Sequence, residues 1–118
     1  MKILIVDDSL INLKVEQKML EKLNCRVETA LSGEECLEKV KETTYDLIFM
    51  DIMMPNMDGV ETFKKLQLLE NFNTPVVTLT ADVENDAKER YLKIGFNDYL
   101  SKPASMDQLK QVLNNYES

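Results

Sequence analysis

Five polar side chains stand at the ends of short apolar runs in this sequence: Asp7, Asp8, Asp51, Thr80 and Lys102. In a parallel sheet the carboxyl ends of neighbouring strands meet at one edge, so such side chains would lie close together. Three carboxylates that close repel one another, and either their pKa values rise or a cation neutralises them. Oxygen ligands with open positions for water favour Mg²⁺, so the three aspartates are candidate magnesium ligands.

Asp51 is the candidate nucleophile, because it stands alone after a central run, whereas Asp7 and Asp8 are adjacent and look like a metal-holding pair. A carboxylate can attack phosphorus and form an acyl phosphate. Phosphoryl transfer asks a protein mainly for positioning and charge stabilisation, which Mg²⁺ and the Lys102 ammonium would supply. The Thr80 hydroxyl offers a hydrogen-bond donor and an acceptor at the same edge.

The elements that must position these groups alternate along the chain. Apolar runs bounded by polar residues predict buried parallel strands at 3–6, 26–30, 47–50, 76–79 and 98–101. Amphipathic segments between them predict helices, caps included, at 10–23, 32–41, 58–69, 83–94 and 105–115. In the first helix, Ile11, Val15 and Met19 form an apolar stripe at a spacing of four.

Local signals mark the ends of these helices. Ser32, Asp58 and Ser105 are predicted N-cap residues, and the two serines begin capping boxes. Asn24 and Gly95 follow helical segments and can take the left-handed conformation that ends a helix. Each predicted helix is therefore short and lies between two strands.

This order of elements indicates an α/β fold in which helices cover both faces of one open parallel sheet. With right-handed crossovers, a doubly wound five-stranded sheet of order 2-1-3-4-5 fits, the flavodoxin-like (βα)5 arrangement. Its crevice lies at the carboxyl ends of the first and third strands, where the aspartates stand. The length predicts a single domain over 1–118, with no output domain encoded.

Composition excludes several classes of protein. The chain has 118 residues with 14 Lys and Arg, 21 Asp and Glu, and a net charge of −7, which disfavours nucleic-acid binding. The chain has no histidine, which excludes Ser-His-Asp triads and His-ligated zinc. No apolar run is long enough to cross a bilayer or to act as a signal peptide, so we expect a cytoplasmic protein. Cys25 and Cys36 form no CxxC pair and are expected to be reduced.

Four strings, at the expected strand ends and in order, together resemble the response-regulator receiver domain of two-component signalling. They are Ile3-Leu4-Ile5-Val6-Asp7-Asp8, Met50-Asp51-Ile52-Met53-Met54-Pro55-Asn56-Met57-Asp58-Gly59, Thr80-Ala81 and Ser101-Lys102-Pro103. Each string alone is a weak signal, but the resemblance covers essentially the whole chain.

The resemblance implies a role for each residue of the acidic site. Asp51 looks like the phosphoacceptor. Asp7 and Asp8 look like Mg²⁺ ligands, joined by the Asp51 carboxylate and the backbone carbonyl of Met53. Lys102 looks like the lysine that contacts the phosphoryl group.

The resemblance also implies a switch. Thr80 looks like the hydroxyl that moves toward the phosphoryl group, and Tyr99 occupies the place of an aromatic ring that turns inward on activation. A cis Lys102-Pro103 bond is implied as well, and X-Pro bonds lower its cost. The resemblance further implies that the positions of Met53 and Asp82 affect how fast the phosphoryl group is lost. Met53 is expected to hinder the attacking water and Asp82 to orient it.

The predicted function is a phosphorylation switch that accepts a phosphoryl group from a sensor histidine kinase or a histidine phosphotransfer protein. The donor is expected to dock near the first helix, where Asn12 and Val15 face outward. Output would run through the surface of helix 4, strand 5 and helix 5, by contact with a target protein. Ala104 stands where many DNA-binding regulators of the family carry Phe, which weakens any inference toward that output class.

Other functions remain open on the residues alone. A magnesium-dependent phosphohydrolase with an aspartyl-phosphate intermediate would need a second acid near Asp51 and a substrate cap. A flavin-binding module would need a phosphate-binding loop after the first strand, where Asp7 and Asp8 have the wrong charge. A receiver-like module that binds partners without phosphorylation would not need the acids, Thr80 and Lys102 together.

Overall fold

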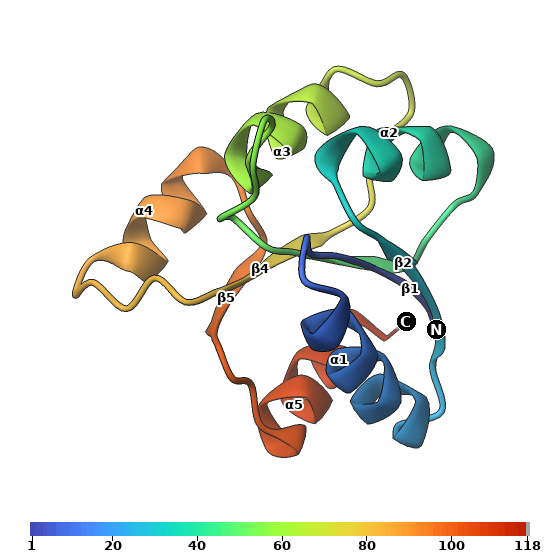
Figure 1. Ribbon diagram of the computed structural model, residues 1–118, viewed down its shortest axis with the longest axis vertical. Helices are drawn as coiled ribbons and strands as arrows, with labels where there is room; N and C mark the ends of the chain where they lie inside the picture. The colour runs from blue at the N-terminus through green and yellow to red at the C-terminus, as the bar shows by residue number, and fades with distance from the viewer. Residues whose placement is uncertain (118) are drawn as a thin grey trace.

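The structure is a computed structural model that describes residues 1–117, and in it five strands alternate with five helices (Figure 1). The strands are β1 (Lys2–Val6), β2 (Arg26–Ala30), β3 (Leu47–Met50), β4 (Val76–Thr80) and β5 (Asp98–Ser101). The helices are α1 (Leu10–Lys22), α2 (Gly33–Glu42), α3 (Gly59–Gln67), α4 (Ala87–Ile94) and α5 (Met106–Tyr116). The predicted alternation is confirmed.

The strands form one parallel sheet of order β2-β1-β3-β4-β5, as predicted. Helices α1 and α5 cover one face, and α2, α3 and α4 cover the other (Figure 1). Alternate strand residues therefore point into two cores. Ile3 and Phe49 pack toward α1 and α5, while Leu4 and Ile48 pack toward the opposite helices. All four side chains are fully buried, which explains why both strands read as continuous apolar runs.

The predicted helix caps are present. The side chains of Ser32, Asp58 and Ser105 each accept a hydrogen bond from a backbone N–H in the first turn. Ser105 completes its capping box, whereas the carboxylate at the third helical position after Ser32 reaches one residue further back, to the N–H of Leu31. Asn24 has a φ of 67°, the left-handed conformation expected at that helix end.

In the α1 stripe, Ile11 and Val15 are 76% and 54% accessible, which agrees with the expectation that Val15 faces outward, and the buried face of the helix carries Leu13 and Leu20. One predicted helix boundary is wrong. Helix α4 begins at Ala87 rather than at residue 83, because the Asp82 side chain accepts the N–H of Glu84 and forms a turn before the helix. That turn places residues 81–86 in a loop at the carboxyl edge of the sheet.

Three further features bear on the predictions. The Lys102-Pro103 bond is cis, as the resemblance implies. Cys25 and Cys36 are free thiols, in agreement with the expected reduced state. Across residues 1–117, every helix is too short or too polar to span a lipid bilayer.

Candidate functional site

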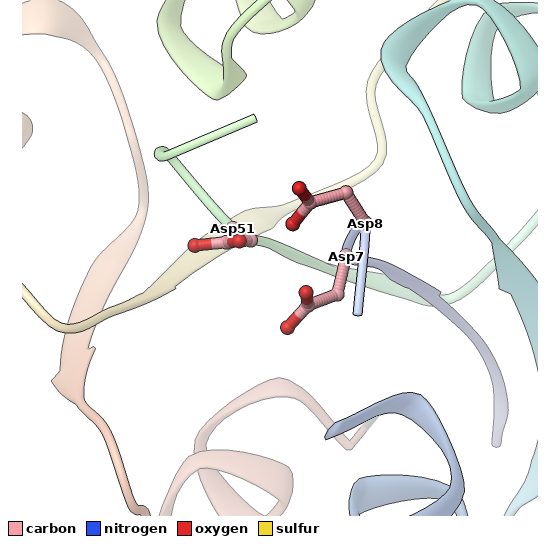
Figure 2. A group of neighbouring side chains, drawn as sticks. All are labelled: Asp7, Asp8 and Asp51. Carbon is pink, nitrogen blue, oxygen red and sulfur yellow. The ribbon is translucent and has the colours of Figure 1, made fainter. Parts of the chain in front are cut away.

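Asp7, Asp8 and Asp51 meet at the carboxyl edge of the sheet (Figure 2). Strands β1 and β3 are parallel neighbours, with Val6 opposite Met50, so the next residue of each strand is brought side by side. The Asp51 N–H donates to the carbonyl of Val6 at 2.9 Å, which extends the ladder by one residue. One carboxylate oxygen from each aspartate lies within 4.8 Å of the others.

The three carboxylates differ in burial. Asp7 and Asp51 are only 1% and 5% accessible, whereas Asp8 is exposed to solvent. Backbone donors partly satisfy the buried pair, since the Ser9 N–H lies 2.9 Å from Asp7 Oδ1 and the Met53 N–H lies 3.3 Å from Asp51 Oδ1. The cluster thus has two anchored carboxylates and one that faces water, an arrangement that leaves ligand positions open.

Lys102 reaches this cluster from the end of β5. Its Nζ lies 2.5 Å from Asp7 Oδ2 and 3.5 Å from Asp51 Oδ1. Its backbone N–H donates to the carbonyl of Thr80 at 2.8 Å, which ties the lysine to the end of β4. The predicted gathering of the three acids and this lysine is therefore present in the fold.

Burial raises the pKa of Asp51 to about 6; Lys102 opposes the rise, while Asp7 adds to it. Burial would by itself lower the pKa of Lys102, but the hydrogen bond to Asp7 and the charge of Asp51 outweigh it and hold the pKa above its ordinary value. Lys102 therefore stays protonated, and it compensates the charge of Asp51 only in part.

Glu16 is a fourth acid of this neighbourhood that the sequence reasoning missed. It lies on α1 and lines a cleft of about 110 Å³ together with Lys102 and Pro103. Burial raises its pKa to about 7, and among residues 1–117 its buried Oε1 has no hydrogen-bond partner. Its spacing from Leu13 by three and from Leu20 by four was the available signal, because it places Glu16 on the buried face of the helix.

The chemistry of this donor set fits a hard divalent cation. It consists of three carboxylates, two of which pair with Lys102, and hard ions such as Mg²⁺ prefer oxygen ligands with positions left for water. Met53, whose backbone carbonyl is the fourth expected ligand, follows Asp51 by two residues, and its side chain is 68% accessible.

Thr80 and Tyr99 occupy the β4 and β5 side of the crevice. Thr80 is fully buried, and its hydroxyl accepts the N–H of Asp82 at 3.3 Å. Tyr99 is half-buried, stacks on Tyr91 with ring centroids 6.0 Å apart, and donates its hydroxyl hydrogen to the carbonyl of Asp82. Both predicted switch residues therefore contact the same loop residue, which connects the site to α4.

Comparison with known proteins identifies a family. The model of the response regulator receiver domain matches residues 3–114. The chain is 38% identical over 118 residues to the signal transduction histidine-protein kinase BarA of Escherichia coli K12, and 38% identical over 122 residues to the hybrid signal transduction histidine kinase L of Dictyostelium discoideum. These matches cover 99% and 98% of this chain but only 13% and 7% of the two kinases.

A solved structure shares the fold. The receiver domain of the sensor histidine kinase PA1611 from Pseudomonas aeruginosa PAO1 is 32% identical, with a TM-score of 0.87. The match covers 98% of this chain and 95% of that one. That structure has a magnesium ion coordinated in its active site cleft.

Proposed function

This chain belongs to the response regulator receiver domain family of two-component signalling, and we propose that it is a phosphorylation switch with Asp51 as the phosphoacceptor. The observation that carries the proposal is the convergence of Asp7, Asp8 and Asp51 with Lys102 at one edge of the sheet. The donor is a phosphohistidine on a sensor histidine kinase or a histidine phosphotransfer protein. The proposal includes a single domain and the cytoplasmic location expected from the sequence.

Asp7, Asp8, Asp51 and the backbone carbonyl of Met53 would hold Mg²⁺. When bound, the ion neutralises negative charge where the phosphoryl group approaches the carboxylates. Asp7 and Asp51 are anchored by backbone N–H groups, so their carboxylates are oriented before any ligand arrives. The proposed role of this part of the site is to present Asp51 as a nucleophile despite the surrounding negative charge.

In the transfer step an Asp51 carboxylate oxygen forms a bond to phosphorus while the bond from phosphorus to the donor imidazole nitrogen breaks. The other ring nitrogen of the phosphoimidazole carries a proton, so the imidazole leaves as a neutral group, and the product is an acyl phosphate on Asp51. The Lys102 ammonium, 3.5 Å from Asp51, is within reach of a phosphoryl oxygen and stabilises its charge. The chain thus catalyses only its own phosphorylation and the later hydrolysis, and it turns over no separate substrate.

The added group brings about two negative charges, which biases an equilibrium between two packings of the loop after β4. Thr80 would donate to a phosphoryl oxygen, and in this structure its hydroxyl oxygen accepts the N–H of Asp82. Tyr99 is bonded to the carbonyl of the same residue, so movement of the loop reaches β5 and the neighbouring helices. Output through the α4, β5 and α5 surface, by contact with a target protein, follows from that connection.

The donor is proposed to dock on α1. Leu10, Ile11 and Val15 are apolar and 55%, 76% and 54% accessible, and they stand beside the acidic crevice at the start of that helix. A histidine side chain carried by a protein that packs on this patch would approach Asp51 across the crevice. Substitution of Ile11 by Lys would therefore impair transfer from a protein donor and leave transfer from a small phosphodonor intact.

The decisive experiment is intact mass spectrometry after incubation with Mg²⁺ and a small acyl phosphate. We expect a gain of one phosphoryl group that is absent in Asp51→Asn and absent when EDTA replaces Mg²⁺. Folded protein that gains no mass would favour a binding module that is not phosphorylated. Continuous phosphate release from unrelated phosphate esters would instead favour a magnesium-dependent phosphohydrolase.

A further inference from the structure

A set of charge-assisted hydrogen bonds holds the Asp82 side chain, in the loop between β4 and α4. Its Oδ1 accepts the N–H of Glu84 at 3.1 Å. Its Oδ2 accepts Nη2 of Arg90 at 3.0 Å and the hydroxyl of Tyr91 at 2.9 Å. Both oxygens are therefore engaged, and these donors hold the pKa of Asp82 below its ordinary value, so the group is a carboxylate at neutral pH.

The donors that hold Asp82 are themselves fixed on α4. Arg90 Nε donates to Asp86 at 3.0 Å, and its guanidinium lies 5.5 Å from the centre of the Tyr91 ring. Tyr91 is 5% accessible and packs edge-on against Phe96, with ring centroids 6.1 Å apart. Because one guanidinium contacts carboxylates on both sides of the turn, the geometry directs the Asp82 carboxylate to α4.

The orientation of the Asp82 carboxylate toward α4 matters because of where Asp82 lies. It follows Thr80 by two residues, at the edge of the sheet where an acyl phosphate on Asp51 would form. Hydrolysis joins a water oxygen to phosphorus while the bond from phosphorus to the Asp51 oxygen breaks, and the water proton must go to a base. A free carboxylate in this loop could orient that water and take its proton, after which solvent receives it.

We propose that Arg90, assisted by Tyr91, is a positioning residue that holds the Asp82 carboxylate on α4 and so prolongs the life of the phosphorylated state. The proposal rests on the proposed function, since it needs an acyl phosphate on Asp51. It names Arg90 as the residue through which α4 controls how long the signal lasts.

The test measures the rate at which the phosphoryl mass is lost after the small phosphodonor is removed. Arg90→Ala should speed the loss by about three- to tenfold, less than the 10²–10⁴ that a fully positioned general base supplies. Tyr91→Phe keeps the buried ring and removes one hydrogen bond, so it should give a smaller change in the same direction. Lys88→Ala removes the same charge from an exposed position of α4 and should leave the rate unchanged.

A double-mutant cycle separates this role from a general loosening of the helix. If Arg90 acts through Asp82, then Arg90→Ala should have no effect on the rate in a chain that already carries Asp82→Ala. An unchanged rate in Arg90→Ala, an acceleration that persists in the Asp82→Ala background, or an equal effect of Lys88→Ala would each overturn the proposal while leaving phosphorylation of Asp51 standing. Absence of phosphorylation in the unmodified chain would overturn the proposed function and this inference together.

Discussion

The Asp51 carboxylate should lower the stability of the fold that presents it. Its pKa rises from the ordinary 3.8 to about 6 because the side chain is buried, so the folded chain holds the proton more tightly than the unfolded chain. The stability that this group contributes is complete below about pH 3.8 and is lost as the pH rises through about 6. A difference of this size corresponds to a loss on the order of 3 kcal/mol at pH 8, at about 1.4 kcal/mol for each unit.

Asp51→Asn removes the charge and keeps the shape, so it should recover that loss. In the presence of EDTA, we expect the variant to be more stable than the unmodified chain by about 2–3 kcal/mol at pH 8 and equal to it at pH 4. Urea unfolding checks this, because a slope of about 1–3 kcal/mol per M converts the difference into a midpoint shift of about 1 M or more. Asp8→Asn is the control, since it removes a charge from the same cluster at an exposed position.

Magnesium should remove the difference between the variant and the unmodified chain. At a concentration 100 times its dissociation constant, an ion bound only by the folded chain adds about 2.7 kcal/mol to stability. The unmodified chain should gain that amount at pH 8, and Asp51→Asn should gain much less because a ligand is missing. The reasoning would be refuted if Asp51→Asn and the unmodified chain were equally stable at pH 8 in EDTA. It would also be refuted if the variant were more stable by the same amount at pH 4 as at pH 8.

Three further perturbations have outcomes set by the same contacts. Lys102→Ala leaves the buried Asp7 carboxylate without its cation and should cost about 3–5 kcal/mol in urea unfolding at pH 8. Gly59→Ala would place a Cβ 2.3 Å from the backbone carbonyl oxygen of Asp51, and this overpacking should lower the unfolding free energy by about 1–3 kcal/mol. Glu16→Gln should have a higher urea midpoint than the unmodified chain at pH 8 and the same midpoint at pH 4, since the raised pKa of about 7 disfavours the ionised form. A variant whose midpoint equals that of the unmodified chain at pH 8 would contradict this.

The sequence predicted the fold well because local signals and the sheet pattern agreed with one another. Runs such as Leu47–Met50 are buried on both faces, and only a parallel sheet covered by two helix layers requires that. Cap residues such as Ser105 marked helix ends to within a residue or two. The convergence of Asp7 and Asp51 followed from the position of the crevice in this topology, so the place of the site was predictable before any side-chain geometry.

Side-chain partners from different elements were not predictable. The spacing of Ile11 and Val15 satisfies helical periodicity as well as that of Leu13 and Leu20, and only the packing of α1 against the sheet decides which face is buried. The start of α4 depends on an Asp82 turn that competes with the helix for backbone donors. Such contacts depend on tertiary distances, which periodicity does not contain.

The crevice combines these observations into one energetic argument. Lys102 pairs with Asp7 and Asp51, and Asp8 and Glu16 lie in the same neighbourhood, so at neutral pH the described residues place more negative charge at this edge than Lys102 balances. The fold tolerates the imbalance because the two cores on either side of the sheet are extensive. A binding site for a cation is stronger for the same reason, since the ion relieves repulsion that the sheet imposes. The cost in stability and the capacity to hold Mg²⁺ therefore have one cause. A substitution that removes a carboxylate charge from this edge should raise the stability of the fold and weaken the binding of Mg²⁺.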